Sequence, residues 1–377
     1  MSDQRMRDQR VSDQRVSDQR MPGDRRAVSD RRVLSGRVVR NPTGSFSARV
    51  DVRAATSVVV LLVLALAISL YSLASGDFDV PLPDVVRTLL GEQIPGAQFI
   101  IMDLRLPRTL TALFVGAALG VSGSIFQNLT RNPLGSPDFI GLTIGASSGA
   151  LIVILVMHGS TDQIALGALI GCVVTSVAIY LLAYRKGSQS FRLILVGIGI
   201  GAMLDAFNSF LITRARLDEA VGAQVWLIGT LNGRSWEQLR PLLLTVLIVL
   251  PIAFWQGRHL NMLALGDETA TALGVPVERT RGILFVCAVA LAGVATAAAG
   301  PIAFVALAAP QLALRVTRSA GAGLAGAAAM GALLLVASDW VAQRALPSGP
   351  VPVGIATGLL GGAYLCWLLV HEWRKGR

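Results

Sequence analysis

The stretch AATSVVVLLVLALAISLYSLA at Ala54–Ala74 decides the fold, because it contains no charged residue. A helix of roughly 20 apolar residues, rising about 1.5 Å per residue, crosses a bilayer core of about 30 Å. Several later stretches have a similar length and hydrophobicity. The sequence therefore predicts a bundle of membrane-spanning helices.

The composition narrows the fold class further. The chain is 53% hydrophobic and only 15% charged, whereas a soluble domain carries about 25% charged residues. A backbone in lipid must satisfy its own hydrogen bonds, so helices or a closed barrel are the options. Barrel strands alternate apolar and polar residues over about ten positions, and these runs do not alternate. We predict an all-α polytopic protein, and its 39 glycines suit closely packed helices.

Hydrophobicity and length indicate about ten spans. The span that begins at Ile302 is short and is bracketed by prolines. The predicted spans are Thr56–Ala74, Pro107–Gln127, Ile140–Met157, Ile164–Tyr184, Leu193–Ile212, Leu242–Trp255, Gly282–Ala299, Ile302–Val316, Leu324–Val341 and Val353–Val370.

Basic residues set the predicted orientation. Cytoplasmic loops of membrane proteins carry an excess of Lys and Arg. With the Arg-rich N-terminal region placed in the cytoplasm, ten spans put the C-terminus on that side as well, together with the loops that contain Arg131, Arg185–Lys186, Arg258–Arg281 and Arg315–Arg318. We therefore expect both termini in the cytoplasm, although Arg214 and Arg216 then lie outside and argue mildly against it. The net charge of +10 indicates contact with anionic lipid rather than with nucleic acid.

The first 53 residues differ from the rest of the chain. They repeat SDQR at Ser2–Arg5, Ser12–Arg15 and Ser17–Arg20, they are rich in charge of both signs, and apart from Val and Met their only large apolar residues are Leu34 and Phe46. Such a segment buries too little surface to fold, so we predict a disordered cytoplasmic tail over 1–53 and a transmembrane domain over 54–377. A docking or lipid-binding arm is the alternative use for the tail.

A proline-rich corner follows the second span. Asn132, Pro133 and Pro137 lie within NPLGSP, where two closely spaced prolines end one helix and begin another. The corner is either a gate or contact surface of a pathway, or simply a tight loop between two helices.

The loop between the sixth and seventh spans contains the sequence of a short capped helix. Asp267 is a suitable N-cap, Glu268 complements the helix dipole, Gly274 suits the C′ position and Pro276 can begin the next helix. A helix of about two turns is unstable alone, so it must pack on something. That surface is either a cytoplasmic partner or the same chain.

A break is predicted inside the apolar run GPIAFVALAAP. Gly300 and Pro301 begin this run, Phe304 lies within it, and Pro310 ends it. Broken helices at membrane depth line a cavity or are buried in protein, so this run is a candidate wall of a translocation path. Asp205, in the middle of the fifth span, is a second candidate because ionisable groups inside membranes are usually functional.

Two arginines flank Pro107 at the predicted outer entry to the second span. Arg105 and Arg108 could dock an acidic partner there, or their side chains could extend to the lipid headgroups. We expect no metal site, because the three histidines and the three cysteines form no cluster with ligand spacing. The cysteines all lie in apolar runs, and we expect them to be buried.

Several motifs in order resemble the iron–siderophore and vitamin B12 ABC permease family of FecCD type. The resemblance covers roughly residues 104–369. Its phrases NPLGSPD, FRLILVGIGIGAML and GTLNGRSW most resemble the enterobactin-type members. The motifs are RLPRTL at Arg105–Leu110, VGAALGVSGSIFQ at Val115–Gln127, RNPLGSPDFIG at Arg131–Gly141, LGDETATALGV at Leu265–Val275, GPIAFVALAAP at Gly300–Pro310 and PVGIATGLLGGAYLCWLL at Pro352–Leu369.

The resemblance implies a fold, partners and residue roles. The fold would be the ten-helix type II importer permease, paired with a second and non-identical permease in a bacterial cytoplasmic membrane. Two ATP-binding subunits, which hold ATP and Mg, would bind the short helix, and an extracytoplasmic siderophore-binding protein would dock on Arg105, Arg108 and Arg344. The residues of the short helix that this role involves are Gly266, Asp267, Glu268, Ala270, Leu273 and Gly274.

The sequence departs from the family at Gln311, where most members have histidine. It also lacks a GxxxxGK[ST] phosphate loop, so it cannot hydrolyse ATP alone and is not expected to be an enzyme or to bind a cofactor. Cobalamin, haem or a hydroxamate siderophore are alternative cargoes. An ion-coupled secondary transporter is the rival from another class, although Asp205 is nearly the only ionisable candidate for its relay.

Overall fold

A computed structural model describes residues 37–40, 47–76, 78–183, 190–318, 323–345, 349 and 351–375. The chain forms two compact units, Met1–Val52 and Arg53–Arg377. In the first unit, strands β1 (Arg37–Arg40) and β2 (Ser47–Val50) pair antiparallel, with Arg37 opposite Val50. Sequence reasoning expected a disordered tail over residues 1–53 and did not predict this strand pair. Most of the predicted tail lies outside the described residues.

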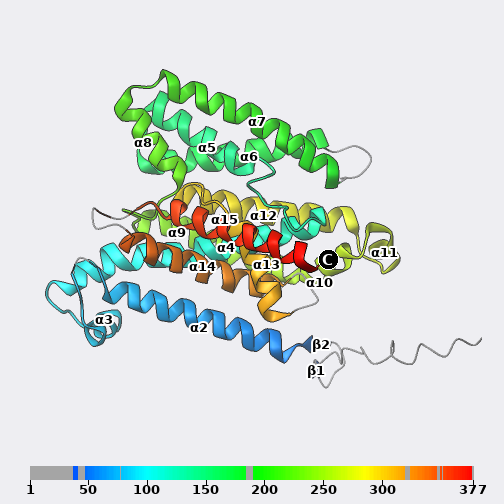
Figure 1. The fold of residues 1–377 in the computed structure, drawn as a ribbon, viewed down its shortest axis with the longest axis horizontal. Coiled ribbons are helices and arrows are strands. Elements are labelled where there is room, and N and C mark those ends of the chain that lie inside the picture. Colours follow the sequence, from blue (N-terminus) through cyan, green and yellow to red (C-terminus); the bar gives the residue numbers. More distant parts are fainter. Residues whose placement is uncertain are drawn as a thin grey trace, which may run out of the picture. The chain divides into compact units, whose positions relative to one another are not determined.

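The second unit consists of helices in its described residues (Figure 1). Their bounds are α2 Val52–Ala74, α3 Leu82–Leu89, η1 Phe99–Arg105 (a π-helix), α4 Leu106–Thr130, α5 Leu142–Ile152, η2 Val153–Met157 (a π-helix), α6 Thr161–Ala183, α7 Ser190–Arg214, α8 Leu217–Ile228, α9 Trp236–Trp255, α10 Gly257–Ala264, α11 Asp267–Ala272, α12 Val277–Ala299, α13 Val305–Thr317, α14 Leu324–Arg344 and α15 Val353–Lys375.

The predicted number of spans is confirmed. Among the described residues, seven helices are long and apolar enough to cross a membrane, and three shorter apolar stretches lie at Leu142–Met157, Val305–Thr317 and Val353–Trp367. Each of the ten coincides with a predicted span. Sequence reasoning missed the three short helices α3, α8 and α10, which lie in the connections. Their hydrophobic stretches are shorter than a membrane-spanning helix, so hydrophobicity and length did not indicate them.

Helices α4, α12 and α14 form the interior of the bundle. Most of the apolar window of each is buried, whereas less than a third is buried in α2, α6, α7 and α9. Helix α4 packs against α12, α13 and α14, while α5 packs against α6 and α7. The helices with exposed apolar faces are placed to meet lipid or another membrane chain.

Small residues permit this packing, as the glycine content predicts. On α4, a Cβ atom added at Gly116 would lie 2.3 Å from the carbonyl oxygen of Gly331 on α14. On α5, a Cβ added at Gly149 would lie 2.0 Å from the carbonyl oxygen of Gly167 on α6. Backbones this close tolerate no side chain, which is how small residues hold helices together in lipid.

The bundle has two distinguishable ends. Helix α3 and the start of α4 lie at one end, which we name the α3 end, and helices α10 and α11 lie at the other, which we name the α11 end (Figure 1). Cys172 and Cys287 are buried as expected, but Cys366 is exposed on α15. The prediction for Cys366 was wrong, because an apolar run in a membrane protein can face outward.

Candidate functional site

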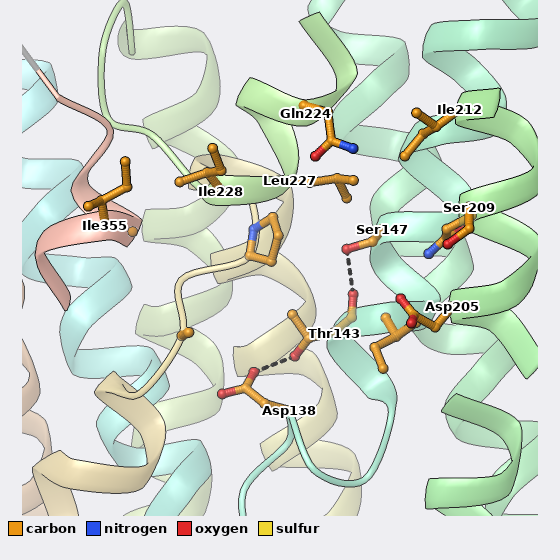
Figure 2. Close-up of a pocket in the computed structure, with 15 residues that line it drawn as sticks. Asp138, Thr143, Ser147, Asp205, Ser209, Ile212, Gln224, Leu227, Ile228 and Ile355 are labelled. Carbon is orange, nitrogen blue, oxygen red and sulfur yellow. Dashed lines mark hydrogen bonds between the residues drawn. The ribbon is translucent and has the colours of Figure 1, made fainter. Parts of the chain in front are cut away.

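A polar pocket of about 550 Å³ lies among α5, α7, α8, the 300–304 segment and the start of α15. Figure 2 shows Asp138, Ser147, Asp205 and Gln224 around it. Its walls mix short polar side chains with aliphatic ones, and among the lining residues that the structure describes, two carboxylates are the only charged groups. The lining residues are Asp138, Thr143, Ile144, Ser147, Asp205, Asn208, Ser209, Ile212, Gln224, Leu227, Ile228, Pro301, Ala303, Gly354 and Ile355.

The predicted helix break forms part of this pocket. Helix α12 ends at Ala299, and α13 begins only at Val305. Gly300 has φ of +75° and Phe304 has φ of +68°, a left-handed conformation that is unusual for an aromatic residue. The extended backbone between them brings Pro301 and Ala303 to the pocket.

Neighbouring loops hold the broken segment in place. The backbone N–H of Thr230 donates to the carbonyl of Ala299 at 2.8 Å. Phe304 packs on α15, where a Cβ added at Gly361 would lie 2.3 Å from the Phe304 Cβ. Ile302 is buried, and Pro301 and Ala303 line the pocket, so this non-helical backbone lines a cavity, which is a condition for having it at membrane depth.

Pro310, at the end of this run, does not interrupt the helix that follows the break. It is the sixth residue of α13. A proline there removes one backbone hydrogen bond, to the carbonyl of residue 306, and the helix continues past it. Pro310 and Gly300 are not among the residues that line the pocket.

Asp138 is a pocket residue that sequence reasoning missed. It directly follows the proline-rich corner, and Thr143 Oγ1 donates to Asp138 Oδ1 at 2.6 Å. Burial raises the pKa of Asp138 to about 6, and the hydrogen bond from Thr143 opposes that rise. The hydroxyl of Ser147 donates to the carbonyl of Thr143 at 2.9 Å, so these three side chains form one polar wall (Figure 2).

Helix α7 supplies the opposite polar wall. Asp205 lines the pocket, as its position in the middle of a span suggested, and Asn208 lines it as well. Asn208 is only 5% exposed, and its Oδ1 has no hydrogen-bond partner among the described residues. A buried acceptor without a partner is costly, so the pocket offers a hydrogen-bond site to water or cargo.

The proline-rich corner is a tight turn beside the pocket. The backbone N–H of Leu134 donates to Asn132 Oδ1 at 2.9 Å, and the N–H of Gly135 donates to the Asn132 carbonyl at 2.9 Å. Pro133 is exposed and Pro137 is buried. None of Asn132, Pro133 and Pro137 lines the pocket, so the corner positions Asp138 instead of forming the wall itself.

The predicted short helix in the loop before α12 is present as α11, Asp267–Ala272. Gly274 follows it with φ of +82°, as a C′ glycine should. The prediction that Asp267 is the N-cap was wrong by one residue, because Gly266 occupies that position with φ of +115°. Pro276 likewise caps α12 and does not begin it.

The side chains of this loop divide into inward and outward groups. Ala270 is buried, while Leu265 and Leu273 are 66% and 58% exposed. Glu268 is also exposed. An exposed charge beside exposed leucines is a surface suited to a partner protein, because such leucines gain from being covered.

Asp267 bonds to its own chain. Arg281 Nη2 donates to both of its carboxylate oxygens at 3.0 Å, and Arg131 at the end of α4 also pairs with it. Burial raises the pKa of Asp267, but the hydrogen bonds and charges of Arg281 and Arg131 outweigh that effect. Its pKa therefore lies below the usual value, and the group is ionised near neutral pH.

The three arginines predicted to dock a binding protein cluster at the α3 end. Arg105 donates to the carbonyls of Leu73 at 2.8 Å and Phe78 at 2.6 Å. Arg344 is exposed, and its guanidinium lies 4.9 Å from the ring centroid of Trp340. Both remain predicted docking residues.

Arg108 differs from the other two arginines. Its Nε and Nη2 donate to Asp339 at 3.0 and 2.7 Å, and only 18% of its side chain is exposed. The salt bridge predicted for a partner protein is made inside the chain, between α4 and α14. Docking through Arg108 stays a prediction, and the structure adds an ion pair with Asp339 that holds its side chain.

Gln311, at the position of the family histidine, belongs to a partly buried amide pair. Its Nε2 donates to Gln127 Oε1 at 2.7 Å, and Gln127 Nε2 donates to the carbonyl of Leu307 at 3.0 Å. The pair joins α4 to α13. No group of three His, Cys, Asp or Glu side chains within the described part of the chain could hold a metal ion.

The comparisons with known proteins agree with this architecture. At 45% identity, the chain is similar to the ferric enterobactin transport system permease protein FepG of Escherichia coli (strain K12), over 81% of this chain and 93% of that protein. At 36% identity it is similar to the achromobactin transport system permease protein CbrC of Dickeya dadantii (strain 3937), over 87% of this chain and 95% of that protein.

Among solved structures, a metal-chelate type ABC transporter in an inward-facing conformation matches with a TM-score of 0.75 and 27% identity. The match covers 84% of this chain and 99% of that chain. The fold is therefore that of a type II ABC importer permease. The family model of the FecCD transport family matches residues 61–371. The chain is thus a membrane permease subunit of the FecCD transport family.

Proposed function

We propose that this chain forms one half of the path by which a ferric siderophore of catecholate, enterobactin type crosses the cytoplasmic membrane. The polar pocket carries this proposal. It lies where a broken helix segment meets α7 and α8, and it offers hydrogen-bonding groups without a metal-ligand cluster. An iron chelate needs no ligand from the protein, because its metal is already coordinated. The similarity to the ferric enterobactin permease supports the cargo class.

The charged groups that line the pocket suit a site through which cargo passes better than a site that binds cargo tightly. Its described lining carries Asp138 and Asp205 and no cationic side chain. This wall therefore does not hold an anionic chelate by ion pairing. A transport path must bind weakly enough to release its cargo, and short hydroxyl and amide groups provide such binding.

The proposed partners follow from the two ends of the bundle. Two ATP-binding subunits, carrying ATP and Mg, drive the cycle, and one of them binds the α11 end through Glu268, Leu273 and Leu265. That end and both termini then face the cytoplasm. An extracytoplasmic siderophore-binding protein docks at the α3 end near Arg105 and Arg344. The second permease, a different chain, covers the open side of the pocket.

A bulky side chain in the pocket should block uptake. Ser209 lines the pocket and is exposed to it, so Ser209→Trp is expected to lower uptake of ferric enterobactin at least about tenfold by filling the path. The measurement is iron-limited growth, and uptake of labelled chelate, in a deletion strain that carries the variant. Val174→Trp is the matched control, because Val174 is a 62% exposed apolar residue of α6 outside the pocket.

The same strain tests the cargo. Growth of the wild-type complement on single chelates distinguishes catecholate from hydroxamate, haem and cobalamin transport. Restored growth only on a hydroxamate chelate would overturn the cargo class. Normal uptake by Ser209→Trp would remove the pocket from the path.

A charge at the exposed leucine of the α11 loop should detach the ATP-binding subunit. Leu273→Asp is expected to reduce copurification of that subunit at least about tenfold, because an apolar contact is replaced by an unpaired carboxylate. The matched control is Leu90→Asp, at an 83% exposed leucine that follows α3. If copurification is undiminished in Leu273→Asp, Leu273 is not a contact of the ATP-binding subunit.

A further inference from the structure

One carboxylate connects three elements at the α11 end. Asp267 begins α11, Arg281 lies in the second turn of α12, and Arg131 follows the last residue of α4. Arg281 binds both oxygens of Asp267 at 3.0 Å, and its own side chain is only 8% exposed. Arg131 pairs with the same carboxylate, and its Nε donates to the carbonyl of Leu263 in α10 at 3.3 Å.

Arg131 is also the first residue of the corner that leads to the pocket. It has a left-handed φ of +50°, and the N–H of Asn132 donates to the carbonyl of Gln127 at 3.1 Å. The corner has little freedom, since a Cβ added at Gly135 would lie 2.3 Å from Thr130 Oγ1. Seven residues after Arg131 the chain reaches Asp138 in the pocket wall.

We propose that Asp267 is a positioning residue that joins α11 to the wall of the pocket through Arg131 and the corner. When an ATP-binding subunit displaces α11, the ion pair moves Arg131 with it, and the stiff corner carries that movement to Asp138. This inference rests on the proposed function, in which α11 is the element that the ATP-binding subunit contacts.

The two acidic residues of α11 then have different tasks. Glu268 is exposed and faces a partner, whereas Asp267 faces its own chain between two arginines. Without the Asp267 charge, the buried Arg281 keeps only the more distant carboxylate of Glu278, at 3.4 Å, among the ion pairs described here. Arg131 then lies near the positive charge of Arg281 with no carboxylate between them. Like charges repel, so Arg131 and the corner would separate from α11.

The test uses the whole complex in proteoliposomes with its binding protein, its ATP-binding subunits and ferric enterobactin. Asp267→Asn keeps the size of the side chain and removes its charge. It is expected to keep copurification and ATP hydrolysis, and to lower the amount of chelate transported per ATP at least about fivefold. Arg131→Gln should give the same phenotype, because it cuts the same connection from the other side.

Glu278→Gln is the matched control for these variants. It removes another carboxylate from Arg281, but this carboxylate joins neither α11 nor the corner. Its transport per ATP should stay at the wild-type value. An unchanged ratio in Asp267→Asn would reduce the ion pair to a stabiliser of the loop, and lost copurification would make Asp267 a contact of the ATP-binding subunit. Either result overturns the proposal.

A second measurement does not depend on the cargo. Spin labels at Leu134→Cys in the corner and Thr271→Cys on α11, in a Cys366→Ser background, report the distance between the two elements. With Asp267 present, the distance should stay the same on ATP binding, and in Asp267→Asn it should change. A distance that changes in both proteins would refute the proposal even if the complex transports no siderophore. Failure to transport ferric enterobactin with an unchanged label distance would instead count against the proposed cargo.

Discussion

Replacing Arg108 with methionine is expected to destabilise the chain by about 3–5 kcal/mol, because Asp339 would become a buried carboxylate without its cation. The Asp339 side chain is only 4% exposed, and its oxygens accept from Arg108 at 2.7 and 3.0 Å. Gln343 donates to the same carboxylate at 2.7 Å, but a neutral amide cannot replace the charge. The measurement is the thermal unfolding midpoint of the purified chain in detergent.

The double variant Arg108→Met with Asp339→Leu is the internal control. Replacing both partners of a buried ion pair by apolar groups is often neutral or stabilising, so most of the loss should be recovered. If Arg108→Met alone keeps the stability of the wild type but no longer captures the loaded binding protein, the result would contradict the structure. That result would support Arg108 as the docking residue that the sequence predicted.

The sequence predicted the spans well because their signal is local. A long apolar run without charge, such as Ala54–Ala74, has few stable structures other than a membrane-spanning helix. The break before α13 was also predictable, since Gly300 and Pro301 are adjacent and each disfavours a continued helix. Pro310 lies inside α13, as the predicted span Ile302–Val316 implies, because one proline can stay inside a helix once its freed carbonyl has another environment.

The polar contacts of the site could not be predicted in the same way. Arg108 and Asp339 are 231 residues apart, and Arg131 and Asp267 are 136 apart. Hydrophobicity and motif spacing carry no information on which distant charges meet. The same limit explains why Asp138 was missed, since its role depends on burial beside a pocket whose other wall is α7.

Replacing Gly123 with alanine is expected to cost about 3 kcal/mol or more, because the added methyl group has no room against backbone. A Cβ there would lie 1.7 Å from the carbonyl oxygen of Ala306 and 2.6 Å from its carbon. This carbonyl is the one that Pro310 leaves without an intrahelical donor, so it is free to approach α4. Helices α4 and α13 would have to separate, and the Gln127–Gln311 pair between them would be strained.

Gly282→Ala is the matched control, since Gly282 lies in α12 and nothing stands within 4 Å of a Cβ added there. In that position alanine should stabilise the helix by up to about 1 kcal/mol. Thermal unfolding of the two variants in detergent separates close helix packing from a general effect of replacing glycine. Equal stability of Gly123→Ala and the wild type would show that α4 and α13 do not meet at Ala306.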